Sequence, residues 1–123
     1  MYPPELKYTK EHEWIRVLEN RAEIGITDYA QTQLGDVVYL DLPESGLSFS
    51  QGEQFGSVES VKAVSDLYLP VSGKVLEVNV AAVSSPELIN EDPRATWLVA
   101  VEILQPRELE ALLDSKDYES LTK

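Results

Sequence analysis

The sequence predicts a mainly β fold, a flattened barrel or sandwich with short flanking helices. Two observations favour it. Short runs of β-branched and aromatic residues recur along the chain. Residues typical of turns, above all Gly, Pro, Asn and Ser, separate these runs at close spacing. Many short strands at such spacing are typical of sandwiches and barrels.

The first strands form a predicted hairpin, which a short helix follows. Residues 14–18 and 22–26 alternate around the polar stretch 19–21, which suits a turn. Thr27 is placed to cap a helix over 28–34 through its hydroxyl. Gly35 is placed to end that helix in the left-handed conformation.

The later strands are separated by the turn signals at 43–46 and 52–53. We expect them at residues 37–42, 54–59, 64–69, 74–80 and 96–103. Three helical pieces flank the last strand: a turn over 87–89 that begins after Pro86, an amphipathic stretch after Pro106, and a C-terminal segment that Ser115 is placed to cap. We interpret them as packing helices.

Composition limits the functions that the chain can have. With 123 residues, 43% hydrophobic and 26% charged, we expect one globular domain over residues 1–123. A net charge of −12 repels phosphate backbones and anionic lipid, so we expect no nucleic-acid or membrane partner. The chain has no cysteine, which excludes disulfides, thiolate metal sites and a cysteine nucleophile. Redox chemistry must therefore arrive on a prosthetic group.

The start of the chain has neither the apolar core of a signal peptide nor an arginine-rich leader, and no apolar run approaches membrane-spanning length. We expect a cytoplasmic protein, or a mitochondrial matrix protein if the chain is a processed organelle form.

Lys62 lies in the short link between the strands predicted at 54–59 and 64–69. The link has no Asn-Gly or Asp-Gly pair, so a primed turn is not favoured. A type I-like turn places Lys62 near the apex with its amine in water, where another enzyme can acylate it. The alternative is that Lys62 is one of ten basic residues on an ordinary surface.

The sequence offers no catalytic or metal-binding constellation. His12 stands between Glu11 and Glu13, but a metal site needs several convergent donors and catalysis needs an oriented nucleophile. We therefore assign His12 a structural or surface role. Because 22 carboxylates stand in 123 residues, chance pairs are expected and no acid pair can be argued. Trp14 and Trp97 are expected to lie in the core or along a groove.

Segments from most of the chain resemble the glycine cleavage system H-protein family, in residue type and in order. Around the hairpin the resemblance rests on ESVKAVSDLY at 59–68 and PVSG at 70–73. It extends to YTKEHEW at 8–14, GITDYAQ at 25–31, LGDVV at 34–38 and NEDP at 90–93. It departs after Pro93, where residues 94–96 lack the glycine-containing stretch usual before the tryptophan.

The resemblance implies a fold of the lipoyl and biotinyl carrier type, the barrel-sandwich hybrid. It implies that Lys62 carries a covalent lipoyl group, with Glu59 and Gly73 as the residues that lipoylating enzymes recognise. Read without the resemblance, Glu59 is a solvated strand charge, and Gly73 is a turn residue that requires positive φ. Biotin carriers typically flank their lysine with methionines, whereas Val61 and Ala63 stand here.

The resemblance also implies the function of a monomeric, non-catalytic shuttle. It carries an aminomethyl group from glycine decarboxylase (P protein) to the aminomethyltransferase (T protein). Dihydrolipoamide dehydrogenase (L protein) then reoxidises the arm. A lipoate ligase or a lipoyl or octanoyl transferase attaches the lipoate. Pyridoxal phosphate, folate, flavin and NAD belong to the partner enzymes.

An aminomethyl group on sulfur is open to hydrolysis, so a carrier must shelter it. Residues 11–14 combine anionic and aromatic groups, and we expect Glu11, Glu13 and Asp66 to line a cleft beside the Lys62 hairpin. The alternative is that these residues only begin a strand and keep it soluble.

Three other classes of protein stay open from the residues alone. A lipoyl domain of a 2-oxoacid dehydrogenase would share the hairpin, but a flexible linker normally joins it to catalytic domains. An H-like protein would relay lipoate to other complexes. An unmodified β-rich binding module would use the same scaffold without an arm.

Overall fold

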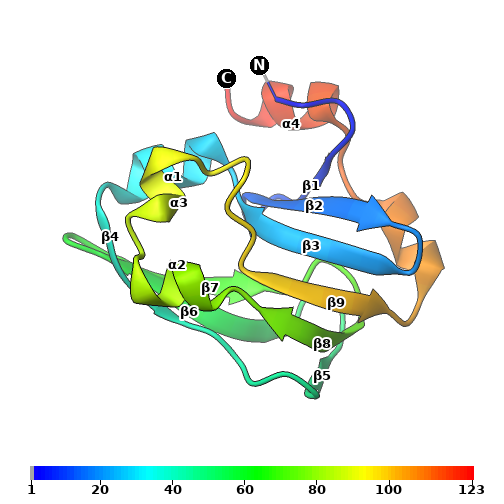
Figure 1. Ribbon diagram of the computed structural model, residues 1–123. Helices are drawn as coiled ribbons and strands as arrows, with labels where there is room; N and C mark the ends of the chain where they lie inside the picture. Colours follow the sequence, from blue (N-terminus) through cyan, green and yellow to red (C-terminus); the bar gives the residue numbers. More distant parts are fainter. Residues whose placement is uncertain (1) are drawn as a thin grey trace.

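The computed structural model describes residues 2–123 and consists of two antiparallel sheets with short helices at their ends (Figure 1). The larger sheet has, in spatial order, β1 (Lys7–Tyr8), β2 (Glu13–Leu18), β3 (Arg21–Ile26), β9 (Val99–Ile103), β8 (Gly73–Val78) and β5 (Ser48–Phe49). The smaller sheet has β4 (Val37–Asp41), β6 (Gln54–Ser60) and β7 (Val64–Tyr68) in that order. The mainly β sandwich that the sequence predicts is confirmed.

The core lies between the two sheets. The larger sheet contributes Ile15, Ile24 and Val101, none of which is more than 1% exposed. The smaller sheet contributes Leu40 and Val58 to the same cluster. Because strand side chains alternate between faces, the opposite face of β4 and β6 is exposed, and it mixes polar and charged residues with the apolar Val38 and Tyr39. Burial of large aliphatic side chains on one face of each sheet is the main force that holds the sandwich together.

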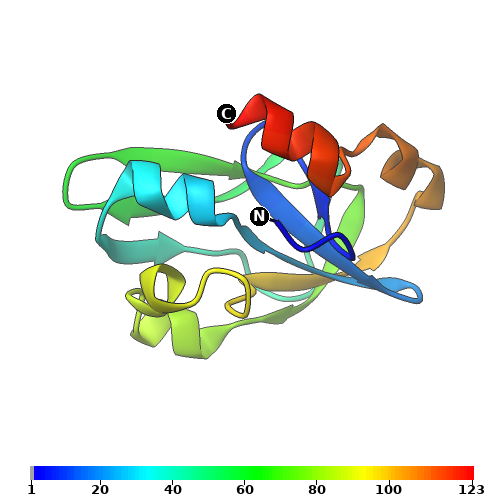
Figure 2. The same ribbon diagram turned by 90° about the horizontal axis from the view of Figure 1, so that it is seen from above.

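Three of the helical elements lie together, and the others lie apart from them (Figures 1 and 2). The three, α1 (Asp28–Leu34), α2 (Val80–Ser84) and α3 (Leu88–Glu91), lie at the end of the molecule where the β6–β7 hairpin projects. The C-terminal helix α4 (Ser115–Leu121) lies beside β1, close to the N-terminal segment. The 3-10 helix η1 (Pro106–Ala111) follows β9.

Helix α1 forms where the sequence predicts it. The Thr27 side chain accepts a hydrogen bond from the Ala30 amide at 3.2 Å, which satisfies one of the free donors at the helix start. Gly35 ends the helix with φ of 79°. Both signals are local in sequence, so the pattern alone is sufficient to predict them.

Three predicted boundaries are wrong. The strand predicted over 74–80 ends at Val78, because the Asn79 side chain caps α2 through the Ala82 amide at 3.3 Å. The strand predicted from residue 96 begins at Val99, because the Thr96 hydroxyl bonds to two carbonyls of the α3 region. Asp114, not Ser115, caps α4 through the Asp117 amide at 2.8 Å.

Among the described residues, no helix is long and apolar enough to cross a membrane.

Candidate functional site

The turn that carries Lys62 is closed by Ser60. The Ser60 amide donates to the Ala63 carbonyl at 2.7 Å. The Ser60 hydroxyl oxygen accepts from the amides of Lys62 at 3.3 Å and Ala63 at 3.0 Å. Among residues 2–123 only His12 and Glu19 are non-glycine residues with positive φ, so the turn is not of a primed type. The Ser60 hydroxyl oxygen thus fixes the turn backbone through hydrogen bonds, whereas a primed turn would be fixed by its own backbone geometry.

The tip of the hairpin is also bound to the rest of the molecule. The Val61 amide donates to the carbonyl of Asp36 at 3.0 Å, in the connection between α1 and β4. The Lys62 side chain runs towards Gly35, where a Cβ would lie 3.5 Å from Lys62 Cε. The Lys62 amine forms no ion pair with any described residue. The structure therefore presents an exposed amine on a fixed turn.

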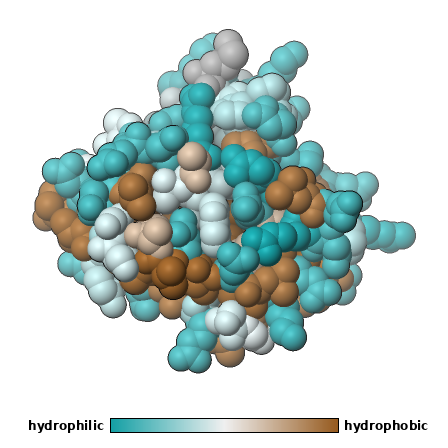
Figure 3. Space-filling view, viewed as in Figure 1, coloured by the Kyte–Doolittle hydropathy of each residue, from teal (hydrophilic) through white to brown (hydrophobic). Residues whose placement is uncertain are grey.

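Glu59 lies on the outer face of the smaller sheet, directly next to the turn. It pairs with Tyr39 of β4 on one side and with Val64 of β7 on the other. Tyr39 is 56% exposed and Val64 65% exposed, although both are large and apolar. Figure 3 shows hydrophobic surface at the end of the molecule where the hairpin projects. Glu59 is therefore a charge within a partly apolar surface beside Lys62.

A cavity of about 300 Å³ lies between the hairpin and α1. Its apolar lining comes from both sheets and from the helix, and it includes Ile26, Ala30, Leu34, Val58, Val64 and Leu67. Its polar lining includes Glu11, His12 and Asp66. An apolar cavity with two carboxylates suits a hydrocarbon chain that ends in a cation. We call it the arm cavity.

Two of the three carboxylates predicted to shelter an arm line this cavity, and the third does not. Glu11 and Asp66 lie on its wall, and Asp66 accepts from the Gln54 amide nitrogen at 3.0 Å. Glu13 is only 1% exposed. Its carboxylate oxygens accept from the Thr9 hydroxyl and from the Tyr68 amide, each at 2.9 Å. Glu13 therefore joins the start of β2 to the end of β7.

Burial raises the pKa of Glu13 to about 7, against two hydrogen bonds that lower it. The carboxyl therefore holds a proton in the folded protein at pH values where it is ionised in the unfolded chain. Because the folded state binds more protons, the free energy of unfolding falls as pH rises from about 4.5 to 7. The loss amounts to roughly 3 kcal/mol and is complete above the folded pKa.

Glu13→Gln tests this linkage, because glutamine matches the protonated carboxyl in shape and stays neutral. We expect the variant to gain roughly 3 kcal/mol relative to wild type between pH 4 and pH 8. Urea unfolding at a series of pH values measures the difference. Glu44→Gln, at an exposed loop carboxylate, is the control and should follow wild type. Parallel curves for Glu13→Gln and wild type would contradict the linkage.

Gly73 is the first residue of β8, buried in the larger sheet rather than in the small sheet that carries Lys62. The expectation that a turn requires positive φ at Gly73 is wrong, because its φ lies outside that region. Instead, a Cβ at this position would lie 2.8 Å from Val101 Cγ2 and 3.1 Å from the Glu102 carbonyl oxygen. Only glycine lets β8 and β9 approach this closely.

His12 is the residue of the arm cavity that sequence reasoning did not select. It has φ of 73°, and its Nδ1 lies 2.7 Å from the Tyr118 hydroxyl of α4. Burial lowers the pKa of His12, against a smaller effect of Glu11. Tyr118 follows His12 by 106 residues, so no local pattern could have joined them. Within residues 2–123, no group of three potential ligands could hold a metal ion.

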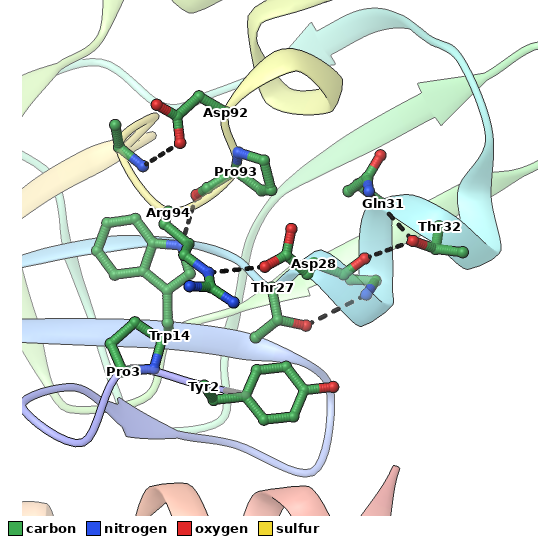
Figure 4. Close-up of polar contacts among 12 residues, drawn as sticks. Tyr2, Pro3, Trp14, Thr27, Asp28, Gln31, Thr32, Asp92, Pro93 and Arg94 are labelled. Carbon is green, nitrogen blue, oxygen red and sulfur yellow. Dashed lines mark hydrogen bonds and ion pairs between the residues drawn. The ribbon is translucent and has the colours of Figure 1, made fainter. Parts of the chain in front are cut away.

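The loop where the family resemblance departs is fixed by Trp14 and α1 (Figure 4). Trp14 is a core residue, 1% exposed, and its indole nitrogen donates to the Pro93 carbonyl at 2.9 Å. Arg94 Nε lies 2.8 Å from Asp28 Oδ2. The residues after Pro93 therefore pack against the same helix that lines the arm cavity.

Comparison with known proteins gives the family. The model for the glycine cleavage H-protein matches residues 6–123. The chain belongs to the glycine cleavage H-protein family. A glycine cleavage system H protein of Symbiobacterium thermophilum is 58% identical over 122 residues, covering 98% of this chain and 95% of the relative. One of Carboxydothermus hydrogenoformans is 56% identical over 120 residues, covering 97% and 92%.

A solved structure agrees with these relatives. The crystal structure of a glycine cleavage system H protein from Mycobacterium marinum superposes with a TM-score of 0.87 at 39% identity, covering 97% of each chain. Members of the H-protein family carry lipoate covalently on a lysine and serve as the shuttle of glycine cleavage. The function and cofactor that the sequence predicts are confirmed at this level.

Proposed function

We propose that Lys62 is the lysine that carries lipoate, and that the arm it forms moves between the arm cavity and the active sites of partner enzymes. The observation that supports this best is an exposed amine on a fixed turn, next to a cavity that is apolar with two carboxylates on its wall. When bound, lipoate would supply a dithiolane disulfide, one sulfur of which can take up an aminomethyl group as the S–S bond is reduced, and which is left as a dithiol once that group is transferred.

The geometry of the turn suits repeated modification and repeated docking. Ser60 and the Val61 amide hold the backbone, so an enzyme that acts on Lys62 does not have to order a flexible loop. An amide-linked lipoyl arm adds up to about a dozen bonds and reaches roughly 14 Å. That length allows the arm either to fold back over Gly35 into the arm cavity or to extend into a partner.

The carboxylates of the arm cavity give it a preference for cations. Glu11 and Asp66 are the carboxylates of a mainly apolar cavity, where attraction to an amine is stronger than in open water. In this proposal they face the loaded end of the arm. Glu13 does not line the cavity and instead holds the Tyr68 amide at the end of β7.

The rest of the proposal follows the family. The chain is one non-catalytic lipoyl-carrier domain, residues 1–123, monomeric and cytoplasmic, with no nucleic-acid or membrane partner. Its partners are the P, T and L proteins, and a lipoate ligase or a lipoyl or octanoyl transferase. Glu59 contributes to recognition by the modifying enzyme, since it borders Lys62 on the exposed face. Gly73 contributes indirectly, by keeping β8 against β9.

Lys62→Arg should abolish lipoylation and carrier activity, because arginine keeps the charge but cannot form the amide. The fold should be unaffected, since the Lys62 amine has no ion-pair partner among the described residues. Peptide mass mapping after coexpression with a lipoate ligase, together with a thermal melt, measures both effects. An unmodified Lys62 in wild type, or lipoate on the strand residue Lys74, would overturn the assignment.

Glu59→Ala should slow initial lipoylation several-fold, because it removes the charge nearest to the turn on the exposed face. It should leave the melting temperature within a few degrees, as expected for an exposed strand residue. Glu44→Ala, a loop carboxylate away from the hairpin, serves as the matched control. Equal lipoylation rates for wild type and both variants would remove Glu59 from the recognised surface.

Glu11→Gln and Asp66→Asn should speed the spontaneous release of ammonia from the aminomethyl-loaded protein, by about fivefold each. Either change removes a charge that attracts the amine and leaves the side chain nearly the same in size. Asp41→Asn, on the outer face of the same small sheet, should have no effect. Release is measured without the transferase. If all variants and wild type release ammonia as fast as heat-unfolded loaded protein, the cavity gives no shelter.

A further inference from the structure

His12 is the single histidine of the chain, and three elements meet around it. Its ring lies 4.7 Å from the Tyr29 ring on α1, and it lines the arm cavity opposite Asp66 of β7. Tyr118 of α4 contacts its Nδ1. The left-handed backbone at His12 is uncommon for a non-glycine residue and places the ring among these groups.

Nδ1 of His12 is one end of a short hydrogen-bonded chain. The Tyr118 hydroxyl lies 2.7 Å from Nδ1 and 2.6 Å from the Thr27 hydroxyl. Tyr118 is fully buried and Thr27 is 2% exposed, so water does not compete for these bonds. These hydrogen bonds connect the C-terminal helix, the start of α1 and the arm cavity.

The direction of the protons follows from counting donors and acceptors. Thr27 Oγ1 already accepts from the Ala30 amide. If Tyr118 donated to Thr27, the Thr27 proton would have no acceptor among the described residues, which is costly for a buried hydroxyl. In the opposite order, Thr27 donates to Tyr118 and Tyr118 donates to His12 Nδ1. Both hydroxyl protons then have an acceptor, and the imidazole carries its own proton on Nε2.

We propose that Tyr118 is a positioning residue for the arm cavity: its hydroxyl donates to His12 Nδ1 and so holds the imidazole neutral. A neutral ring leaves the negative charge of Glu11 and Asp66 uncompensated, so the cavity keeps its preference for a cation. A protonated ring would repel the amine of the loaded arm. This consequence rests on the proposed function of the cavity, whereas the hydrogen-bonded chain does not.

The groups around His12 act in both directions. Burial lowers the pKa of His12, and Glu11 on the same turn raises it. Asp66 lines the same cavity, and Tyr29 contributes an aromatic face. A hydrogen bond from Tyr118 favours the neutral ring, because a protonated Nδ1 cannot accept it. Removal of the Tyr118 hydroxyl should therefore raise the pKa.

NMR of the unmodified protein tests the hydrogen bonds from Thr27 through Tyr118 to His12. Because the protein has a single histidine, the assignment of its ring signals is unambiguous. In wild type we expect the ring nitrogen shifts of the Nε2–H tautomer at neutral pH. In Tyr118→Phe the pKa of His12 should rise by about 0.5 to 1. Tyr2→Phe is the control, because Tyr2 packs on Tyr118 but bonds to Thr122; it should leave the pKa unchanged.

A ring proton on Nδ1 in wild type, or an unchanged pKa in folded Tyr118→Phe, would overturn the proposal. The wild-type tautomer decides the question even if Tyr118→Phe does not fold. With aminomethyl-loaded protein, ammonia release should accelerate on acidification. In Tyr118→Phe, the pH at which this acceleration begins should rise by the same amount as the pKa of His12. An onset that stays at the wild-type pH would exclude an effect on the arm. An unmodified Lys62 would refute the proposed function alone, since the NMR test needs no arm.

Discussion

The hydrogen bond from the Val61 amide to the Asp36 carbonyl ties the tip of the β6–β7 hairpin to the connection after α1. A free two-stranded hairpin is only marginally stable in water, and its tip would sample many positions. This bond and the hydrogen bonds to the Ser60 hydroxyl hold the hairpin tip in one position. The position of the Lys62 side chain beside Gly35, and of the hairpin residues that line the arm cavity, depends on how this tip is held. A carrier needs such a fixed base, because only the arm itself should be mobile.

Negative charge is distributed unevenly around this base. Glu11 and Asp66 line the arm cavity, whereas Glu13 is buried outside its lining and accepts a hydrogen bond from the Tyr68 backbone amide. Burial is costly for an ionised carboxylate, and the pKa of Glu13 rises accordingly. Glu13, one of the three carboxylates expected to line the cleft, therefore joins β2 to β7 instead. The two exposed carboxylates remain available to a ligand.

Sequence reasoning succeeded mainly where the physical cause is local, although it missed the Asn79 cap of α2 and selected Ser115 in place of Asp114 as the cap of α4. The Thr27 cap, the Gly35 end of α1 and the turn around Lys62 each depend on neighbours within a few residues. It failed where partners are far apart. The burial of Glu13 depends on Tyr68, 55 residues away, and the setting of His12 depends on Tyr118. For Gly73 the expected turn is wrong, since the structure requires a glycine there for the approach of Val101 on a neighbouring strand.

We expect a group carried on Lys62 to occupy the arm cavity between the hairpin and α1. Methyl NMR tests it most directly, by comparing the unmodified protein with the lipoylated, aminomethyl-loaded protein. The methyl signals of Ala30, Leu34 and Val64 should shift on loading. Those of Val83 and Leu104, which lie outside the cavity lining, should stay in place. If the cavity methyl signals stay as they are in the unmodified protein, the arm lies in solvent and does not occupy the arm cavity.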